Sequence, residues 1–466
     1  MSHPLQAFRS RSGRKTLLVL AALDTVSTLA VFNLVGHFRG VSEGLIIWPL
    51  LAPLAALSFA IYLIGGYRSR TDMMSLDYTN LHAVALVAAM LATLLLTFVF
   101  FPGGFELQSS RTVIALSFLV IIPLTLSYRR LVYEKAIAAR SGYNFVFLGP
   151  KESCEAFREE CRAMSTWQPV IHSWPSATPP AAETAGDEIL SQPFPEVLAA
   201  VAEDRLAVEA IVLSESSRGL GAETAQQLVQ LHFNGIPTYT SEQFHQFYWQ
   251  KIPLRCIEPS WLFQEGFQIT REPVFERMKR ASDMVLSTLG LLLAAPFIAL
   301  AAIAILVEDR GPVFFHQNRV GMHRRIFSAA KLRSMRSAAP KDGNLYTQPG
   351  DTRVTRVGRI LRVTHLDELP QLWNVLKGDM SLIGPRPEWD RLVDEYESKI
   401  PCYDFRHLVK PGITGWAQVN YHYGASIDDT IRKLEYDLYY IRNFSFTLDA
   451  SIMIKTVHVM LFGKGR

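Results

Sequence analysis

The chain has 466 residues, with 47 lysines and arginines against 43 aspartates and glutamates, so its formal net charge is +4. Hydrophobic residues make up 49% and charged residues 19%, which is less charge than ordinary soluble domains carry and excludes a disordered chain. The 28 glycines exclude collagen, and the 4 cysteines, which have no C-x-x-C or zinc-type spacing, indicate neither a disulfide scaffold nor a cysteine metal site.

The charge changes sign along the chain, which indicates three modules with different neighbours. Residues 1–140 carry 12 basic and 6 acidic side chains, residues 141–270 carry 7 and 16, and residues 271–466 carry 28 and 21. The two basic modules could face anionic lipid or phosphate ligands. No motif supports nucleic-acid binding, so no nucleic acid is expected as a partner.

Four apolar runs in the first module predict a transmembrane four-helix bundle, because each is close to the ~20 residues that cross a bilayer. They cover 16–36, 44–65, 80–102 and 112–128. Basic residues gather before the first run, between the second and third, and after the fourth, so both ends of the bundle should be cytoplasmic. For the short fourth run, a buried core helix is the alternative.

A fifth apolar run, residues 284–307, has Pro296 near its midpoint, where proline kinks or breaks a helix. Basic residues flank it on both sides. The positive-inside rule therefore favours entry and exit through the same leaflet, as a re-entrant helix with its break at Pro296. A fifth span with a simple proline kink is the alternative.

The middle module alternates strands and helices, which predicts a parallel α/β layer. The expected strands are 143–150, 208–213 and 236–239, and the expected helices are 152–163 and 221–234. The turn after Gly149 lacks the glycine pattern of a dinucleotide site. We therefore expect a degenerate, Rossmann-like module with a spacer or regulatory role.

An acidic pair lies among many cations in the third module. Asp367 and Glu368 follow Thr364, which we expect to cap a short helix. Neighbouring helical side chains diverge by about 100°, so one carboxylate could attack phosphorus while the other holds Mg²⁺ together with substrate phosphate. The cations that could neutralise a diphosphate are Lys331, Arg333, Arg353, Arg362 and Arg386. Taken alone, the pair is better explained as an ordinary helix start with solvated arginines.

Longer motifs favour the opposite interpretation. They are the proline-containing apolar helix, Gly311-Pro-Val-Phe-Phe, Gln317-x-Arg-Val-Gly321, Lys331-x-Arg-Ser-Met335, Leu-Asp-Glu-Leu-Pro-Gln, Gly378-Asp-Met-Ser-Leu-Ile-Gly-Pro-Arg-Pro387 and Lys410-Pro-Gly-Ile-Thr-Gly415. Through these motifs, residues 276–460 closely resemble the bacterial sugar transferase family, the monotopic phosphoglycosyl transferases. With its preceding spans and insert, the whole chain resembles the large polyprenyl-phosphate hexose-1-phosphate transferase subgroup.

The resemblance implies a reaction and the residues that perform it. A sugar phosphate would pass from a UDP-sugar to undecaprenyl phosphate and release UMP, as the first membrane step of exopolysaccharide, capsule or O-antigen synthesis. Asp367 would carry a covalent phosphosugar, and Glu368 would be associated with Mg²⁺, or with Mn²⁺ in its place. The positions implied to bind substrate are Lys331, Arg333, Arg353, Arg362, Arg386, Gln317 and Arg319.

The implied fold is a membrane protein of class α plus α/β. It would have a four-helix bundle at 1–140, a Rossmann-like cytoplasmic domain at 141–270, and a mainly α catalytic domain at 271–466 with a re-entrant helix at 281–307. The catalytic domain would face the cytoplasm at the bacterial inner membrane, in contact with its lipid. A homodimer is left open.

Two residues depart from the family's usual pattern. Ala295 precedes Pro296 where many members have serine, whose hydroxyl could help to satisfy the backbone groups freed at the break. His365 replaces a frequent serine beside the dyad; we interpret it as tolerated variation, with a catalytic base as the alternative. Trp416 and Gln418 are candidates for contact with uridine.

Three other functions fit the sequence less well. A sugar-nucleotide dehydratase would need Tyr-x-x-x-Lys and an intact glycine fingerprint, and a dolichol-type glycosyltransferase would normally show Asp-x-Asp; the chain has neither. A non-enzymatic scaffold for polysaccharide export would leave the dyad and its arginines without purpose. No residue identifies the sugar, for which glucose and galactose are the leading candidates.

Overall fold

The computed structural model of the chain describes residues 6–40, 44, 47–67, 71, 73–100, 111–138, 143–164, 166, 168–174, 191–203, 205–214, 221–254, 273–336, 353–421, 424 and 426–462. The chain divides into two compact units, Met1–Gln250 and Lys251–Arg466. The division into three domains with boundaries at 140 and 270 stays a prediction.

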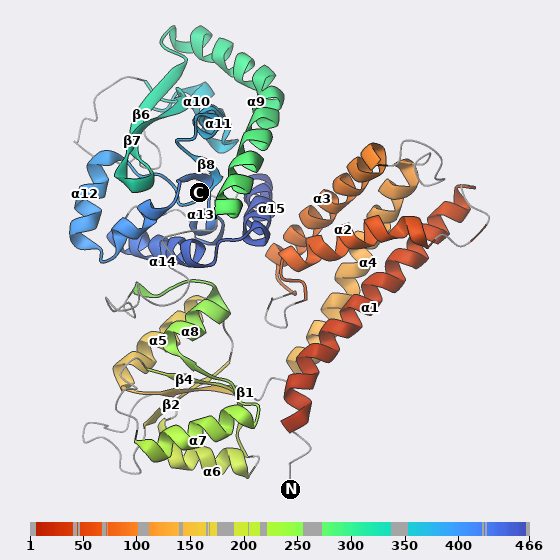
Figure 1. Cartoon of the computed structure of the whole chain (residues 1–466), viewed down its shortest axis with the longest axis vertical. Coiled ribbons are helices and arrows are strands. Elements are labelled where there is room, and N and C mark those ends of the chain that lie inside the picture. The colour runs from red at the N-terminus through yellow and green to blue at the C-terminus, as the bar shows by residue number, and fades with distance from the viewer. Residues whose placement is uncertain are drawn as a thin grey trace. The chain divides into compact units, whose positions relative to one another are not determined.

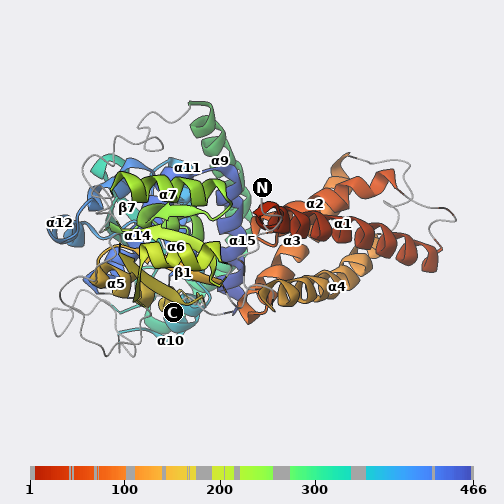
Figure 2. The ribbon, with the colours of Figure 1, turned by 90° about the horizontal axis from the view of Figure 1, so that it is seen from below.

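The N-terminal part of the first unit is a bundle of apolar helices. Its elements are α1 (Gln6–Phe38), the 3-10 turn η1 (Trp48–Leu50), α2 (Leu51–Leu63), α3 (Leu76–Phe100) and α4 (Arg111–Ala138). Helix α1 packs against α4, and α2 packs against α3 (Figures 1 and 2). Within the described residues, four helices of the whole chain are long and apolar enough to cross a membrane: Thr16–Phe38, Leu76–Phe98, Arg111–Lys135 and Phe275–Asp309.

Three of these four helices match predicted runs of the first module, but the second predicted run is shorter than expected. Its described apolar helix covers only Trp48–Leu63. The helix ends at Leu63, and Gly65, whose φ of 76° is left-handed, follows its cap residue Ile64. The amide of Gly65 bonds to the Tyr62 carbonyl and that of Gly66 to the Ile61 carbonyl, which is the Schellman arrangement that closes a helix.

A buried ion pair joins α1 to α4. The Nη1 and Nη2 atoms of Arg129 donate to Asp24, at 2.8 and 2.6 Å, and neither side chain is exposed. The hydroxyls of Tyr67 and Tyr128 also donate to the Asp24 carboxylate. Charged groups within a membrane persist only when they are paired and hydrogen-bonded, and here four donors share one carboxylate.

The second part of the first unit is a parallel sheet of five strands in the order β3-β2-β1-β4-β5. Its elements are β1 (Tyr143–Leu148), α5 (Lys151–Ala163), β2 (Val170–Trp174), β3 (Ser191–Pro193), α6 (Phe194–Ala202), β4 (Ala207–Leu213), α7 (Ala222–Phe233), β5 (Thr238–Thr240), α8 (Ser241–Phe244) and the π-helical turn η3 (His245–Trp249). The predicted α/β layer is confirmed, and β2 and β3 are additional strands.

Each face of this sheet has its own apolar core, because alternate residues of a strand point to opposite sides. Phe145 and Phe147 pack on α5 and α8, whereas Val146 and Leu148 pack on α6 and α7. Figure 1 shows α5 and α8 on one face and α6 and α7 on the other. The result is a doubly wound layer.

The second unit combines helices with a short β-hairpin. Its elements are α9 (Pro273–Asp309), β6 (Phe314–Val320), η6 (Met322–Arg324), β7 (Ile326–Leu332), α10 (Arg356–Val363), η7 (Leu366–Glu368), α11 (Gln371–Lys377), β8 (Ser381–Ile383), α12 (Asp390–Lys399), η8 (Tyr403–Leu408), β9 (Gly412–Thr414), α13 (Trp416–Asn420), α14 (Ile427–Asn443) and α15 (Phe446–Phe462). Its largest core lies between α12, η8, α13 and α14, and Tyr403 and Leu438 are fully buried within it.

The prediction that the helix is interrupted at Pro296 is wrong. Helix α9 runs unbroken for 37 residues with Pro296 inside it, and Figure 1 shows it bending along its course. Proline removes one backbone hydrogen bond, which a bend accommodates. The other bonds remain, because unpaired backbone groups in an apolar setting are costly.

Both ends of α9 are fastened to the same unit. Near its start, Arg280 donates to the carbonyl of Leu376 at 2.6 Å, and Asp283 accepts from the amide of Leu382 at 3.1 Å. At its end, the carboxylate of Glu308 accepts from the amides of Arg356 and Val357 at 2.8 and 2.9 Å. Both ends of the long apolar helix are therefore bonded to this one globular unit, and between them α9 also packs against α11 and α10.

Candidate active site

Glu368 is held between two cations. Its Oε1 atom accepts from Lys331 Nζ and from Arg386 Nη2, both at 2.7 Å, while Oε2 accepts only a longer bond from Arg386 Nη1 at 3.4 Å. Burial alone would raise the pKa of this carboxyl, but the charges and hydrogen bonds of Arg386 and Lys331 outweigh it and hold the pKa well below its usual value. Glu368 is therefore a firmly ionised anchor.

Asp367 has a different environment although it is the next residue. Its side chain is buried, at 8% exposure. Among the described residues, no side chain or amide donates a hydrogen bond to its carboxylate. Burial and the neighbouring Glu368 charge raise its pKa, against the opposing charges of Lys331 and Arg362. A desolvated carboxylate without donors is more basic than a solvated one, which suits attack on an electrophile.

The turn that carries the dyad differs from the one expected. Thr364 does not cap the dyad's helix at its start; it closes the preceding helix α10, and its hydroxyl donates to the Ile360 carbonyl at 2.8 Å. His365 follows with a left-handed φ of 56°, and Leu366–Glu368 then form a 3-10 turn. This reversal at His365 separates the dyad from α10 and gives the two carboxylates their different surroundings.

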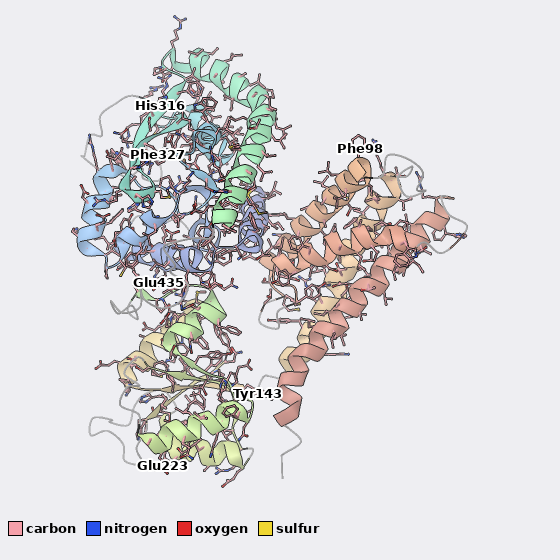
Figure 3. All side chains as sticks on the ribbon, viewed as in Figure 1. Phe98, Tyr143, Glu223, His316, Phe327 and Glu435 are labelled. Carbon is pink, nitrogen blue, oxygen red and sulfur yellow. The ribbon has the colours of Figure 1, made fainter. Side chains whose placement is uncertain are left out.

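The β6–β7 hairpin supplies Lys331 and places two other predicted residues near it. In the antiparallel register Phe315 pairs with Lys331 and Gln317 with Ala329, so Gln317 and Arg319 lie on the same face of the hairpin as Lys331. Figure 3 shows this hairpin, with Phe327 labelled on its second strand. Burial lowers the pKa of Lys331 against the opposing charge of Glu368.

Arg319 is also anchored at the segment that carries Arg386. It donates to the carbonyl of Pro387 at 3.0 Å and to Gln317 Oε1 at 2.6 Å. The structure thus brings most of the predicted substrate-binding residues together around Asp367 and Glu368, through direct contact, a shared strand face or an electrostatic effect on the dyad. They are Gln317, Arg319, Lys331, Arg362 and Arg386.

Arg333 and Arg353 have other surroundings. Arg333 is buried and lies 3.2 Å from Asp309 at the end of α9. It also explains the glycine of the Gly-Pro motif, since a Cβ on Gly311 would lie 1.8 Å from the Arg333 guanidinium. The backbone of Arg353 accepts a hydrogen bond from Arg336 at 2.9 Å, beside a β-bridge between Met335 and Val354. Contact of either side chain with substrate stays a prediction.

The predicted uridine contact of Trp416 is not supported. Its ring is buried, at 3% exposure, and stacks on Tyr439 with a centroid distance of 6.1 Å. Gln418 donates to the carbonyl of Ile413 at 2.9 Å. The Trp416 ring is therefore occupied inside the unit, whereas the buried Oε1 atom of Gln418 accepts no hydrogen bond from the described residues, and contact of Gln418 with uridine stays a prediction.

The sequence pattern did not single out Asn374, which supports the site through β7. Its side chain accepts from the amide of Ala330 at 3.0 Å and donates to the carbonyl of Ser328 at 2.8 Å, so it bonds to β7 as a strand neighbour would. Lys331 is the residue that follows Ala330 in β7, so Asn374 supports the strand segment that carries this lysine. The signal was present: Asn374 is a single polar residue within the apolar run 372–376.

The dyad fits a divalent cation that arrives with the substrate. No group of three or more histidine, cysteine, aspartate or glutamate side chains with metal-site geometry occurs in the described part of the chain. Mg²⁺ is commonly held by one or two carboxylates together with substrate phosphates and water. Asp367 and the lightly engaged Oε2 atom of Glu368 provide such a partial set.

Known proteins match the part of the chain that holds this site. A sequence model described as bacterial sugar transferase matches residues 274–463. An uncharacterized sugar transferase of Bacillus subtilis (strain 168) is 42% identical over 193 residues, which are 40% of this chain and 89% of that protein. The chain belongs to the bacterial sugar transferase family.

Other relatives of this chain, which are longer proteins, have names that specify a reaction. A UDP-N-acetylgalactosamine-undecaprenyl-phosphate N-acetylgalactosaminephosphotransferase of Aeromonas hydrophila is 40% identical over 257 residues, 55% of this chain and 60% of that protein. A UDP-glucose:undecaprenyl-phosphate glucose-1-phosphate transferase of Escherichia coli (strain K12) is 45% identical over 186 residues, 39% of each chain. The match therefore spans less than two thirds of either of these two proteins.

Proposed function

We propose that the chain transfers a sugar 1-phosphate from a UDP-sugar to undecaprenyl phosphate and releases UMP. The observation that carries this proposal is the pairing of an uncommitted, buried carboxylate at Asp367 with a cation-clamped one at Glu368. A buried nucleophile beside fixed positive charge is what phosphoryl transfer requires. The names of the relatives support the same reaction class.

The first step forms a covalent intermediate. A carboxylate oxygen of Asp367 attacks the phosphorus that bears the sugar, the bond from that phosphorus to the bridging oxygen breaks, and UMP leaves with the electron pair. Arg386 and Lys331 are near enough to the dyad to contact the phosphate oxygens as their charge redistributes. Glu368 keeps these two cations in place between turnovers.

The second step returns the carboxylate. A phosphate oxygen of undecaprenyl phosphate attacks the same phosphorus, the bond to Asp367 breaks, and the lipid diphosphate sugar leaves. Splitting one displacement into two requires the nucleophile to be a good leaving group as well, which a carboxylate on phosphorus is. In the first step, a divalent cation held by Glu368 together with the substrate diphosphate would neutralise charge on the departing UMP.

We also propose that the second unit lies at the cytoplasmic face of the membrane, with α9 inserted as a re-entrant helix. Its support is that both ends of α9 bond to this one unit, Arg280 at the start and Glu308 at the end. Single cysteines introduced beside Arg280 and Arg310 should be labelled from the same side of sealed vesicles. Labelling from opposite sides would contradict the re-entrant topology.

The activity is tested with the purified full chain in nanodiscs, undecaprenyl phosphate and a panel of UDP-glucose, UDP-galactose and UDP-N-acetylgalactosamine labelled in the sugar. We expect label in the lipid fraction and matching UMP release with at least one donor. Asp367→Asn is the matched control, because it keeps the shape of the side chain without the charge that attacks. Absence of lipid-linked label for every donor would contradict the proposal.

A further inference from the structure

The loop that carries Arg386 has few backbone amides with which to donate hydrogen bonds. Pro385 and Pro387 flank the arginine, and neither has an amide hydrogen to donate. A small pocket also adjoins the loop, lined by Arg386, Arg406 and Val409 among others. The two prolines therefore leave the backbone beside Arg386 without amide donors of its own.

The loop is held through its carbonyl oxygens instead. Four consecutive carbonyls each accept a hydrogen bond, from β9, η8 and β6 of the same unit: Pro385 from the Gly412 amide at 2.9 Å, Arg386 from Arg406 Nη2 at 2.9 Å, Pro387 from Arg319 Nη1 at 3.0 Å, and Glu388 from the Val320 amide at 3.1 Å. Two of these four donors are guanidinium groups. The bond to the carbonyl of Arg386 itself comes from one of them.

Arg406 is built to make that bond. Its side chain is buried, at 6% exposure, and its Nη2 atom donates to Asp437 at 2.9 Å as well as to the carbonyl of Arg386. Its Nη1 atom donates to the Tyr403 hydroxyl at 2.6 Å. A planar guanidinium offers several donors in a rigid fork, so one side chain can serve three acceptors at once.

We infer that Arg406, held by Asp437, is a positioning residue that keeps the Arg386 side chain directed at Glu368 and the substrate diphosphate. Arg406 itself contacts neither the dyad nor, under the proposed reaction, the phosphates. If the Arg406 guanidinium served only to form a buried ion pair, Asp437 would be a sufficient partner for it. The additional bond to the Arg386 carbonyl ties this buried pair to the site. The inference rests on the proposed function for its catalytic consequence.

The variant Arg406→Lys separates the ion pair of residue 406 with Asp437 from its hydrogen bond to the Arg386 carbonyl. A lysine keeps a positive charge beside Asp437 but cannot reproduce the fork that also reaches the Arg386 carbonyl. Asp437→Asn is the second variant, which leaves Arg406 in place but removes its anchor. Glu435→Gln is the control: Glu435 lies on the same helix α14, is labelled in Figure 3, and forms a buried pair with Lys251 at 3.2 Å.

The first measurement does not depend on activity. Phenylglyoxal modifies accessible guanidinium groups, and peptide mass spectrometry reports the rate at Arg386, whose side chain is 40% exposed. We expect labelling of Arg386 to be several-fold faster in Arg406→Lys and Asp437→Asn than in wild type, with Arg324 in the same unit as the internal reference. An unchanged rate at Arg386 would overturn the inference whatever the activity.

The second measurement links positioning to turnover. Arg406→Lys should lower kcat/KM for UMP release at least tenfold while Glu435→Gln stays within twofold of wild type. In an Arg386→Lys background the same Arg406→Lys change should have less than a threefold effect, because the group it positions is already altered. Equal losses in both backgrounds would overturn the inference. A wild-type protein that releases no UMP would refute the proposed function instead, and the labelling rates would still decide the positioning role.

Discussion

Replacing Arg386 by alanine tests the charge arrangement around the dyad. Glu368 accepts three hydrogen bonds from cations, and Arg386 donates two of them, at 2.7 and 3.4 Å. A hydrogen bond to a charged group contributes about 1.5–3 kcal/mol. Since the Arg386 side chain is 40% exposed, water can replace part of that interaction, and we expect a stability loss of only about 1–2 kcal/mol.

The loss of activity should be larger than the loss of stability. Removing one preorganised charge stabiliser typically lowers rate by about a hundredfold or more, which is about 2.7 kcal/mol of transition-state stabilisation. Initial rates of UMP release at varied UDP-sugar would give kcat/KM for Arg386→Ala and wild type. The control is Arg324→Ala, because Arg324 forms exposed pairs with Asp394 and Glu397 in the same unit. If Arg386→Ala keeps more than a fifth of wild-type kcat/KM, the arginine is merely solvated.

Three further predictions concern the support of β7 by Asn374, the effect of Glu368 on stability at acid pH, and the need for a divalent metal ion. Asn374→Ala should lower the melting temperature by roughly 5–15 °C, because it leaves two groups of β7 unpaired; an unchanged value would show that water replaces the amide. Because its pKa is lowered in the folded protein, Glu368 stabilises the fold above pH 4.5 and loses this effect as the pH falls further. Melting temperatures between pH 3 and 7 should therefore fall less steeply on the acid side in Glu368→Gln, and identical slopes would contradict the clamp. Excess chelator should abolish transfer, and added Mg²⁺ should restore it; full turnover in chelator would refute a metal requirement.

Hydrophobic length and periodicity predicted the long apolar helices and the parallel layer, because both depend on patterns within one segment. The end of the second apolar run was predicted at residue 65, beside Gly65 and Gly66, which close α2, whereas the start of its helix at Trp48 lies later than the predicted residue 44. The short strand β3 carries only three residues and no apolar alternation. Its pairing with β2 supplies its stability, and pairing is not written in the local sequence.

The site shows the same limit. Motifs identified the dyad, Lys331 and Arg386, which the structure joins in one cluster. They could not show that Arg333 is paired with Asp309, since that pairing depends on how the end of α9 meets β7. Likewise, no local pattern indicates that Arg406, twenty residues after Arg386, donates to its carbonyl. Long-range side-chain contacts of this kind emerge only from the folded unit.

The covalent role of Asp367 is the central claim, and mass spectrometry of the protein incubated with a UDP-sugar alone tests it most directly. The account predicts a phosphosugar adduct on the peptide that contains Asp367, with a single UMP released per protein molecule in the absence of lipid. The adduct and the UMP burst should both be missing in Asp367→Asn. An unmodified protein that releases UMP only after undecaprenyl phosphate is added would contradict the account and indicate direct displacement by the lipid.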